Sequence, residues 1–398
     1  MSVTAPKGFR AAGVTAGLKA SGKPDLALIV NEGPSRVAAA VLTANRVHAA
    51  PVAWTRQAVA DGRARAVVLN SGGANACTGK PGYADTVATA ERAALLLSCE
   101  PTEVLVCSTG LIGERLNMDK LLPGIEQAEL QLDAYEDGGE DGAWQGGADA
   151  AVAIMTTDTR PKQTLAVDPG GWSIGGMAKG AGMLAPGLAT MLCVLTTDAN
   201  VDAKLADAAL RAATATTFDR VDSDGCMSTN DTVILLANGA SGVSPDAAVF
   251  AEALTAACAD LARQLVADAE GASHDIVITV RGATTENAAV AVARAVARSN
   301  LFKAAIFGND PNWGRVLSAV GTVPEEVAPF DPDSLDVAIN GVKVCRAGGV
   351  GEPRELVDLA VSREVQVDID LHAGNAEATL LTNDLTHDYV HENSAYST

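Results

Sequence analysis

Thr190 is a candidate nucleophile, because it lies where a stretch with a flexible backbone meets a predicted buried strand. The segment from Gly176 to Ala189 is rich in glycine and other small residues, and Met191 begins a run typical of a buried strand. A threonine hydroxyl is a weak nucleophile unless a base stands beside it. If the bond before Thr190 were cut, its new α-amino group, with an ordinary pKa of about 8, could take the hydroxyl proton. An ordinary loop-to-strand junction is the structural alternative.

A second candidate ends a predicted strand. Ser108, Thr109 and Gly110 close the run "EVLVCSTG" and could present a hydroxyl and a bare backbone N–H. Two such donors aimed at one oxygen form an oxyanion hole, which stabilises the negative charge that develops during acyl transfer. Turns of this composition are common, so the pattern by itself leaves a plain turn as the alternative.

Three further polar stretches are weaker candidates. The stretch 72–81, "GGANACTGKP", does not fit a phosphate loop, because alanine stands at the first glycine position and proline follows the lysine. Two interpretations stay open: backbone N–H donors that bind a carboxylate, or a plain turn. The stretch 307–316, "FGNDPNWGRV", could line a site or bond its own backbone, with Arg315 paired to an acid. The aspartates of 218–231 lack the alternate spacing of a calcium loop.

Histidine and cysteine patterns argue against metal and triad chemistry. The five histidines, His387 and His391 with Asp388 between them included, are interpreted as surface or strand-end residues, and no G-x-S-x-G motif is present. The seven cysteines include no C-x-x-C pair, which indicates reduced core thiols. The sequence therefore predicts no metal site and no bound cofactor.

Composition excludes two classes of partner. The 398 residues carry 29 Lys and Arg against 49 Asp and Glu, a net charge of −20 that would repel nucleic acid over most of the surface. The sequence shows no apolar run of membrane-spanning length and no secretory leader pattern. We therefore expect a soluble, cytoplasmic protein without a nucleic-acid or membrane partner.

Short β-branched runs alternate with alanine-rich helical patterns, which predicts a mixed α/β fold. Strands are predicted over 64–70 and 103–110 with a helix between them, and again in "MLCVLTTDA" and "DTVILLANGAS". The stretch 132–150 is acidic and glycine-rich and is predicted as an exposed loop, with strand-like residues over 151–159.

The second half of the chain carries two sharper signals. An amphipathic helix is predicted with Ser244 as its N-cap, Pro245 as its first residue and Gly271 beyond its end. The tail alternates like a sheet with one solvated face, and Asn340-Gly341 marks a two-residue hairpin.

Several long motifs in one order along the whole chain resemble the ornithine acetyltransferase family. They are "GFRAAGVTAGLK", "NSGGANACTG", "STGLIG", "TTDTRPK", "KGAGMLAPGLATMLCVLTTDA", "STNDTV", "AEGAS", "FGNDPNWGR" and "YVHENSAYST". The resemblance implies self-cleavage between Ala189 and Thr190, giving an α chain of 1–189 and a β chain of 190–398 that intertwine in one core. It also implies an αββα-type sandwich of the DmpA-like class, with mixed sheets, helices outside and a smaller C-terminal α/β region.

The activity implied by the resemblance is glutamate N-acetyltransfer in the cyclic arginine biosynthesis pathway. Acetyl would pass from N2-acetyl-L-ornithine to L-glutamate by a ping-pong route through acetyl-Thr190, in an α2β2 heterotetramer. Acetyl-CoA stays open as a second donor. Motif matches place the oxyanion hole at Thr109 and Gly110 and put these residues on substrate-binding positions: Thr157, Lys179, Thr190, Glu270, Asn393 and Thr398.

The residue types suit those roles, and two other classes of function stay open. Lys179 can complement a substrate carboxylate and Glu270 a substrate ammonium, while Asn393 and Thr398 can orient the ligand by hydrogen bonds. An N-terminal-nucleophile amidase or aminopeptidase would use water as the acceptor. A binding or structural protein would leave the Thr190 junction uncut.

Overall fold

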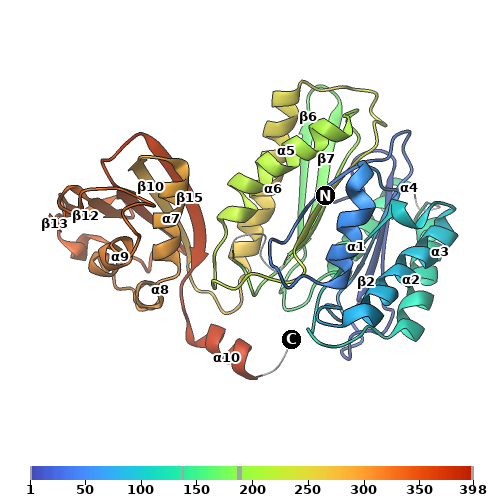
Figure 1. The fold of residues 1–398 in the computed structure, drawn as a ribbon, viewed down its shortest axis with the longest axis horizontal. Helices are drawn as coiled ribbons and strands as arrows, with labels where there is room; N and C mark the ends of the chain where they lie inside the picture. The colour runs from blue at the N-terminus through green and yellow to red at the C-terminus, as the bar shows by residue number, and fades with distance from the viewer. Residues whose placement is uncertain (1, 137–138, 186–190, 396–398) are drawn as a thin grey trace.

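Two mixed sheets lie face to face in the larger part of the molecule (Figure 1). The computed structural model describes residues 2–136, 139–185 and 191–395. The first sheet has the order β1-β2-β4-β5, with β1 (Phe9–Val14), β2 (Leu26–Asn31), β4 (Ala66–Asn70) and β5 (Val104–Ser108). The second has the order β3-β9-β8-β7-β6, with β3 (Val37–Leu42), β9 (Thr232–Ala237), β8 (Leu192–Thr197), β7 (Trp172–Lys179) and β6 (Lys162–Asp168).

Helices cover the outer face of each sheet, which completes the predicted αββα layering (Figure 1). The first sheet carries α1 (Ala50–Ala58), α2 (Gly79–Leu97), α3 (Met118–Glu136) and α4 (Gly139–Ala153), and the second carries α5 (Ala203–Thr216) and α6 (Ala247–Ala267). Short 3-10 turns are η1 (Val59–Asp61), η2 (Pro101–Glu103), η3 (Phe218–Arg220), η4 (Pro332–Ser334) and η5 (Arg354–Leu356).

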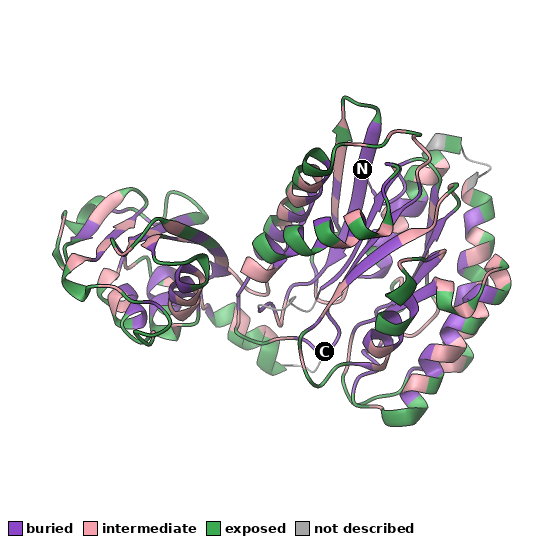
Figure 2. Ribbon diagram, turned by 45° about the horizontal axis from the view of Figure 1, so that its top comes forward, coloured by how far each residue is buried: buried purple, intermediate pink, exposed green. Residues whose placement is uncertain are grey.

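Strand β8 shows why strands of the second sheet have continuous apolar sequences. Leu192 and Val194 pack with residues of the first sheet, whereas Cys193 and Leu195 pack with residues of α5 and α6. Successive side chains of a strand point to opposite faces, so a strand covered on both sides needs apolar residues at every position. The purple interior strands of Figure 2 follow this pattern.

The predicted loop over 132–150 is wrong, because most of this stretch is helical. Its described residues belong to the end of α3 and to α4, and α4 continues to Ala153 where strand-like residues were expected. The glycines permit close packing of α4 on β1: a Cβ on Gly146 would lie 2.2 Å from the Ala11 carbonyl oxygen. A sequence that looks too glycine-rich for a helix is thus a helix in which Gly146 lets the neighbouring strand approach closely.

We expect Gly146→Ala to destabilise the fold through this contact. The added methyl has no space against the β1 backbone, so the helix must shift, at a cost of about 1–3 kcal/mol in the free energy of unfolding. Gly314→Ala is the matched control, because Gly314 is exposed in a helix and its Cβ would meet only Asn312 Oδ1 at 3.5 Å. Thermal unfolding should show a lower Tm for the first variant only. Equal Tm values would contradict this packing.

A smaller α/β unit follows α6, as the sequence predicts for the C-terminal region (Figure 1). Its sheet has the order β13-β12-β11-β14-β10-β15, with β10 (Asp275–Ala283), β11 (Asp336–Ile339), β12 (Val342–Arg346), β13 (Gly349–Val350), β14 (Glu364–Asp370) and β15 (Ala376–Asn383). Its helices are α7 (Glu286–Ala297), α8 (Asn300–Phe307) and α9 (Trp313–Val320), and α10 (His387–Ala395) then returns toward the larger part.

Two predictions in this half have different outcomes. The hairpin is confirmed: Asn340 and Gly341 join β11 to β12 with φ values of 47° and 81°, the left-handed turn that this dipeptide favours. The predicted start of α6 is wrong, because Asp246 is the N-cap and its side chain accepts from the Ala248 N–H. The Ser244 hydroxyl instead accepts a hydrogen bond from Asn200.

Within the described part of the chain, no helix combines the length and the apolar character that crossing a bilayer requires.

Candidate active site

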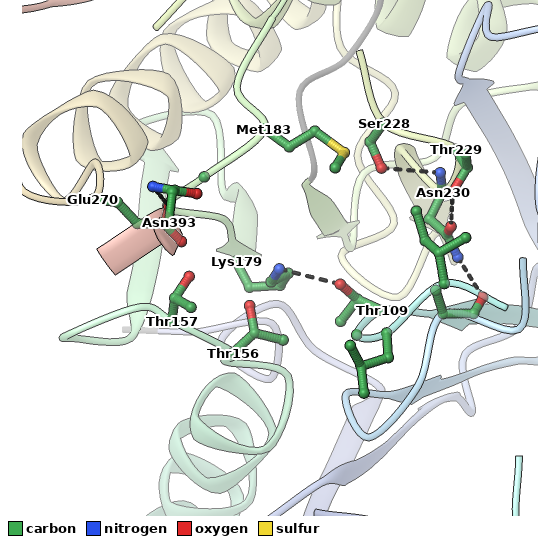
Figure 3. Close-up of a pocket in the computed structure, with 15 residues that line it drawn as sticks. Thr109, Thr156, Thr157, Lys179, Met183, Ser228, Thr229, Asn230, Glu270 and Asn393 are labelled. Atoms are coloured by element: carbon green, nitrogen blue, oxygen red, sulfur yellow. Dashed lines mark hydrogen bonds between the residues drawn. The ribbon is translucent and has the colours of Figure 1, made fainter. Parts of the chain in front are cut away.

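A cavity of about 390 Å³ lies where strand ends and loops of both sheets meet α10 (Figure 3). Thr109, Gly110, Thr157, Lys179, Glu270 and Asn393, all named from the sequence, line this cavity. The other lining residues are Ala74, Leu111, Ile112, Thr156, Gly182, Met183, Ser228, Thr229 and Asn230. The fold therefore gathers residues from seven separate segments into one concave surface.

Lys179 supplies the cation of the cavity wall. It is the last residue of β7, its exposed fraction is 1%, and its Nζ donates to Thr109 Oγ1 at 3.2 Å. Burial lowers the pKa of Lys179, and the nearby Asp158 carboxylate is the strongest influence in the opposite direction. The hydrogen bond described for Lys179 Nζ goes to a hydroxyl, and a buried ammonium group without a carboxylate partner among the described residues is suited to an anionic ligand.

Thr109 and Gly110 offer two donors of different kinds. The Thr109 N–H is occupied, because it donates to the Asn70 carbonyl at 2.9 Å. Its hydroxyl accepts from Lys179, which leaves the hydroxyl hydrogen free to donate into the cavity. Among the described residues the Gly110 N–H meets no acceptor. An oxyanion here would therefore be held by the Thr109 hydroxyl and the Gly110 N–H.

Only glycine fits at position 110. Its φ is 130°, and a Cβ there would lie 2.7 Å from the backbone nitrogen of Gly73. Gly73 also pairs with Thr109 in an isolated bridge, so the two turns are pressed together. The close approach keeps the Gly110 N–H at the cavity surface.

Glu270 and Asn393 form the acidic end of the cavity. Asn393 Nδ2 donates to Glu270 Oε2 at 3.0 Å, and Figure 3 shows this pair on the other side of Lys179 from Asn230. The Glu270 N–H donates to the Ala181 carbonyl at 2.9 Å, which ties the segment after α6 to the segment after β7. The cavity thus presents a cation and a carboxylate at separate positions, the arrangement that suits a zwitterionic amino acid.

Ala189, Thr190 and Thr398 lie outside the described residues. The chain is described again from Met191, whose N–H donates to Asp231 Oδ1 at 3.1 Å and whose carbonyl accepts from the Thr232 N–H at 3.1 Å. Burial raises the pKa of Asp231 well above its usual range. The residue that follows Thr190 is therefore held in register beside β9.

Asn230 holds two cavity loops together, and sequence reasoning did not single it out. Its Nδ2 donates to the carbonyls of Ala74 and Ser108 at 2.7 and 2.8 Å, and Figure 3 shows it beside Thr109. The polar density of 218–231 was the available signal, but it was weighed only as a calcium loop. The bond to the Ala74 carbonyl holds the stretch 72–81 against the cavity, and Ala74 is part of the cavity wall.

Sequence comparison decides the family. A profile of the ArgJ family matches residues 10–398. The chain belongs to the ArgJ family. The arginine biosynthesis bifunctional protein ArgJ of Streptomyces coelicolor is 63% identical over 397 residues, and that of Bifidobacterium longum is 58% identical over 398 residues; each match covers 100% of both chains. A solved ornithine acetyltransferase complexed with ornithine, from Mycobacterium tuberculosis, is 56% identical over 48% of this chain and 96% of that chain, with a TM-score of 0.43.

The ArgJ-family motif "FGNDPNWGRV" lies outside the cavity, between α8 and α9. Asn312 caps α9 by accepting from the Arg315 N–H, and its Nδ2 donates to Asp310. The structural interpretation of this stretch is therefore confirmed, except that Arg315 donates to the Leu301 carbonyl rather than to an acid. Asp310 instead faces Arg354 at 3.7 Å.

Histidine and cysteine side chains of this ArgJ-family chain do not enter the cavity wall. His274 precedes β10, and its ring Nδ1 lies 2.9 Å from Asp384 Oδ2, with a largely buried side chain. All seven cysteines are free; Cys107, Cys193, Cys258 and Cys345 are buried, as expected of core thiols, but Cys77 and Cys226 are exposed. Over residues 2–136, 139–185 and 191–395, no cluster of His, Cys, Asp and Glu has the make-up of a metal site.

Proposed function

We propose that this chain is an acetyltransferase of arginine biosynthesis that moves acetyl from N2-acetyl-L-ornithine to L-glutamate. Its near-full-length similarity to arginine biosynthesis proteins supports the pathway. The observation that carries the reaction is the cavity in which Thr109, Lys179 and Glu270 converge. The substrates fit because both are amino acids with an α-carboxylate, and ornithine adds a side-chain ammonium.

The first half-reaction forms an ester on Thr190. The Thr190 hydroxyl attacks the acetyl carbonyl while its own α-amino group takes the proton. Negative charge on the carbonyl oxygen is held by the Thr109 hydroxyl and the Gly110 N–H. The C–N bond of the acetylated amine then breaks, the proton passes to the leaving nitrogen, and ornithine departs. In the second half-reaction the glutamate amine attacks the ester and restores the hydroxyl.

Recognition divides between the two charged positions. Lys179 pairs with the substrate carboxylate, and Glu270, steadied by Asn393, pairs with the ornithine ammonium. Thr157 and Thr398 complete the orientation by hydrogen bonds. No metal or cofactor takes part in this route.

The catalytic amine arises by self-cleavage between Ala189 and Thr190, which yields an α chain of 1–189 and a β chain of 190–398. The two products would stay together, because β7 of the first pairs with β8 of the second and β3 of the first pairs with β9 of the second. We further propose an α2β2 assembly, and we assign the enzyme to the cytoplasm, where free amino acids are made.

One assay distinguishes acetyl transfer to glutamate from hydrolysis. Purified protein is incubated with N2-acetyl-L-ornithine, with and without L-glutamate, and free acetate and N-acetyl-L-glutamate are measured. The proposal expects N-acetyl-L-glutamate with glutamate and little acetate without it. Equal acetate release in both would identify a hydrolase instead. A parallel incubation with acetyl-CoA and glutamate tests the second donor.

We expect Asn393→Ala to raise the KM for N2-acetyl-L-ornithine by about 5- to 20-fold, because a hydrogen bond to a charged group contributes about 1.5–3 kcal/mol, less when it is exposed. The Glu270 carboxylate would lose its described side-chain partner at 3.0 Å. Ser394→Ala on the same helix is the control, since Ser394 is exposed and its described hydrogen bond is a long one of 3.5 Å to the His391 carbonyl. Equal KM values for both variants would contradict this role.

A further inference from the structure

A buried cluster of charges lies behind the cavity wall. Lys162, at the start of β6, has an exposed fraction of 0%, and its Nζ lies 2.6 Å from Asp158 Oδ1 and 2.6 Å from Asp268 Oδ2. Both carboxylates are buried as well. Such a cluster is costly to desolvate and adds little to stability compared with an apolar core of the same volume.

Asp158 also bonds to the backbone of two segments that form the cavity. Its Oδ1 accepts from the Gly180 N–H at 2.7 Å, and its Oδ2 accepts from the Thr156 N–H at 2.9 Å. One carboxylate thus joins the end of β7 to the loop that follows α4. The geometry leaves neither segment free to move without the other.

Asp268 fixes a third segment to the same loop. Its Oδ2 accepts from the Thr159 N–H at 3.1 Å, and its Oδ1 accepts from the Thr159 hydroxyl. Asp268 follows the last turn of α6 and stands two residues before Glu270. The same lysine therefore links the segment that carries Glu270 to the segment bonded to Asp158.

Three residues that line the cavity lie within two sequence positions of residues that make these bonds. Thr157 lies between Thr156 and Asp158, Lys179 precedes Gly180, and Glu270 follows Asp268 by two positions. We propose that the Asp158–Lys162–Asp268 cluster positions Thr157, Lys179 and Glu270 relative to one another, and so sets the spacing at which the enzyme accepts the two charged ends of its substrate. This inference rests on the proposed function.

Charge balance supports the same role. The cluster carries one net negative charge, and Lys179 is the fourth charge beside it. Asp158 has its pKa raised by burial, but Lys179 and Lys162 outweigh burial and the pKa falls below its usual range. The ionised Asp158 in turn favours the protonated form of Lys179. Asp158 thus also helps to keep the binding cation charged, whereas Lys162 lowers the pKa of Lys179.

Asp158→Asn tests the proposal with almost no change of volume. The asparagine oxygen can still face Lys162 and Gly180, but its NH2 group then faces the Thr156 N–H, and two donors cannot bond. We expect the KM for N2-acetyl-L-ornithine to rise about tenfold or more, because hydrogen bonds to a charged group, which contribute about 1.5–3 kcal/mol, then no longer hold the binding residues at their spacing. The value of kcat should change less than KM, and self-cleavage should persist.

The control is Asp222→Asn, which removes a buried carboxylate that pairs with Arg298 at 2.8 Å and does not line the cavity. It should leave KM within about twofold of wild type. If Asp158→Asn does not fold, Asp268→Asn takes its place, with the same expected rise in KM. Wild-type KM in a folded variant of either position overturns the proposal.

Amide hydrogen exchange separates this inference from the function itself. The amides of Thr156 and Gly180 should exchange at least about tenfold faster in Asp158→Asn than in wild type, and at the wild-type rate in Asp222→Asn. Unchanged exchange in Asp158→Asn overturns the positioning role. If wild-type protein transfers no acetyl, the proposed function fails, and the positioning of the three residues is still decided by exchange.

Discussion

Replacing Thr190 by alanine should leave the chain in one piece and abolish acetyl transfer. Alanine has no hydroxyl to attack the preceding carbonyl, so neither the cut nor the new amino terminus can form. The nucleophile of the transfer step is lost with it. We expect the rate to fall by about four orders of magnitude or more, as when the nucleophile of other covalent enzymes is removed.

Thr190→Ser is the matched control, because it keeps the hydroxyl. It should still be cut into two fragments and retain measurable transfer. A denaturing gel and a transfer assay on both variants decide the point. A cut Thr190→Ala chain would show that the nucleophile of self-cleavage lies elsewhere, and full transfer by that variant would remove Thr190 from the reaction.

Lys179→Met should weaken catalysis chiefly through substrate binding. Methionine fills a similar volume in the buried wall but offers no charge to the substrate carboxylate. Truncating one partner of a buried ion pair costs about 2–5 kcal/mol, so kcat/KM should fall by roughly 30- to 5,000-fold. The variant also removes the hydrogen bond to Thr109 Oγ1. Part of the loss should therefore appear in kcat.

A pH profile distinguishes binding by charge from packing. Burial lowers the pKa of Lys179, so the wild-type enzyme should lose its binding cation at a lower pH than an ordinary lysine would. We therefore expect kcat/KM to fall as the pH rises through that lowered pKa and to recover when the pH is lowered again. Lys179→Met should lack this alkaline loss. The same loss in both proteins would assign it to another group.

Much of the fold could be predicted because burial follows simple periods. Continuous apolar runs marked β8 and β9, which are covered on both faces, and the alternating tail marked the half-solvated sheet that contains β14. The Asn340-Gly341 hairpin followed from local backbone preference alone. These signals are local, so a single sequence is enough to find them.

Helix α4 could not be predicted in the same way. Its composition suggested a loop, since glycine lowers helix propensity and acidic runs are usually solvated. Its helical form depends on contact with β1, where the small size of Gly146 permits close approach. Tertiary packing outweighs local helix propensity here, and the sequence of the stretch does not indicate which strand it packs against.

The candidate site was predictable in its residue types but not in its assembly. The setting of Thr190 and the donors at Thr109 and Gly110 could be argued from local pattern. Their meeting with Lys179 could not, because Thr109 and Lys179 are 70 positions apart in the sequence. Only the family resemblance brought them together in advance. Asn230 and the Asp158–Lys162–Asp268 cluster emerge only from the folded chain.

One measurement tests the central claim most directly. The protein is incubated with N2-acetyl-L-ornithine in the absence of glutamate, quenched in acid, and its fragments are examined by mass spectrometry. We predict one added acetyl group on the fragment that begins at Thr190, carried by the Thr190 side chain and removed when glutamate is supplied before the quench. Ornithine release without an acetylated fragment, or an acetyl group on a different residue, would contradict the account.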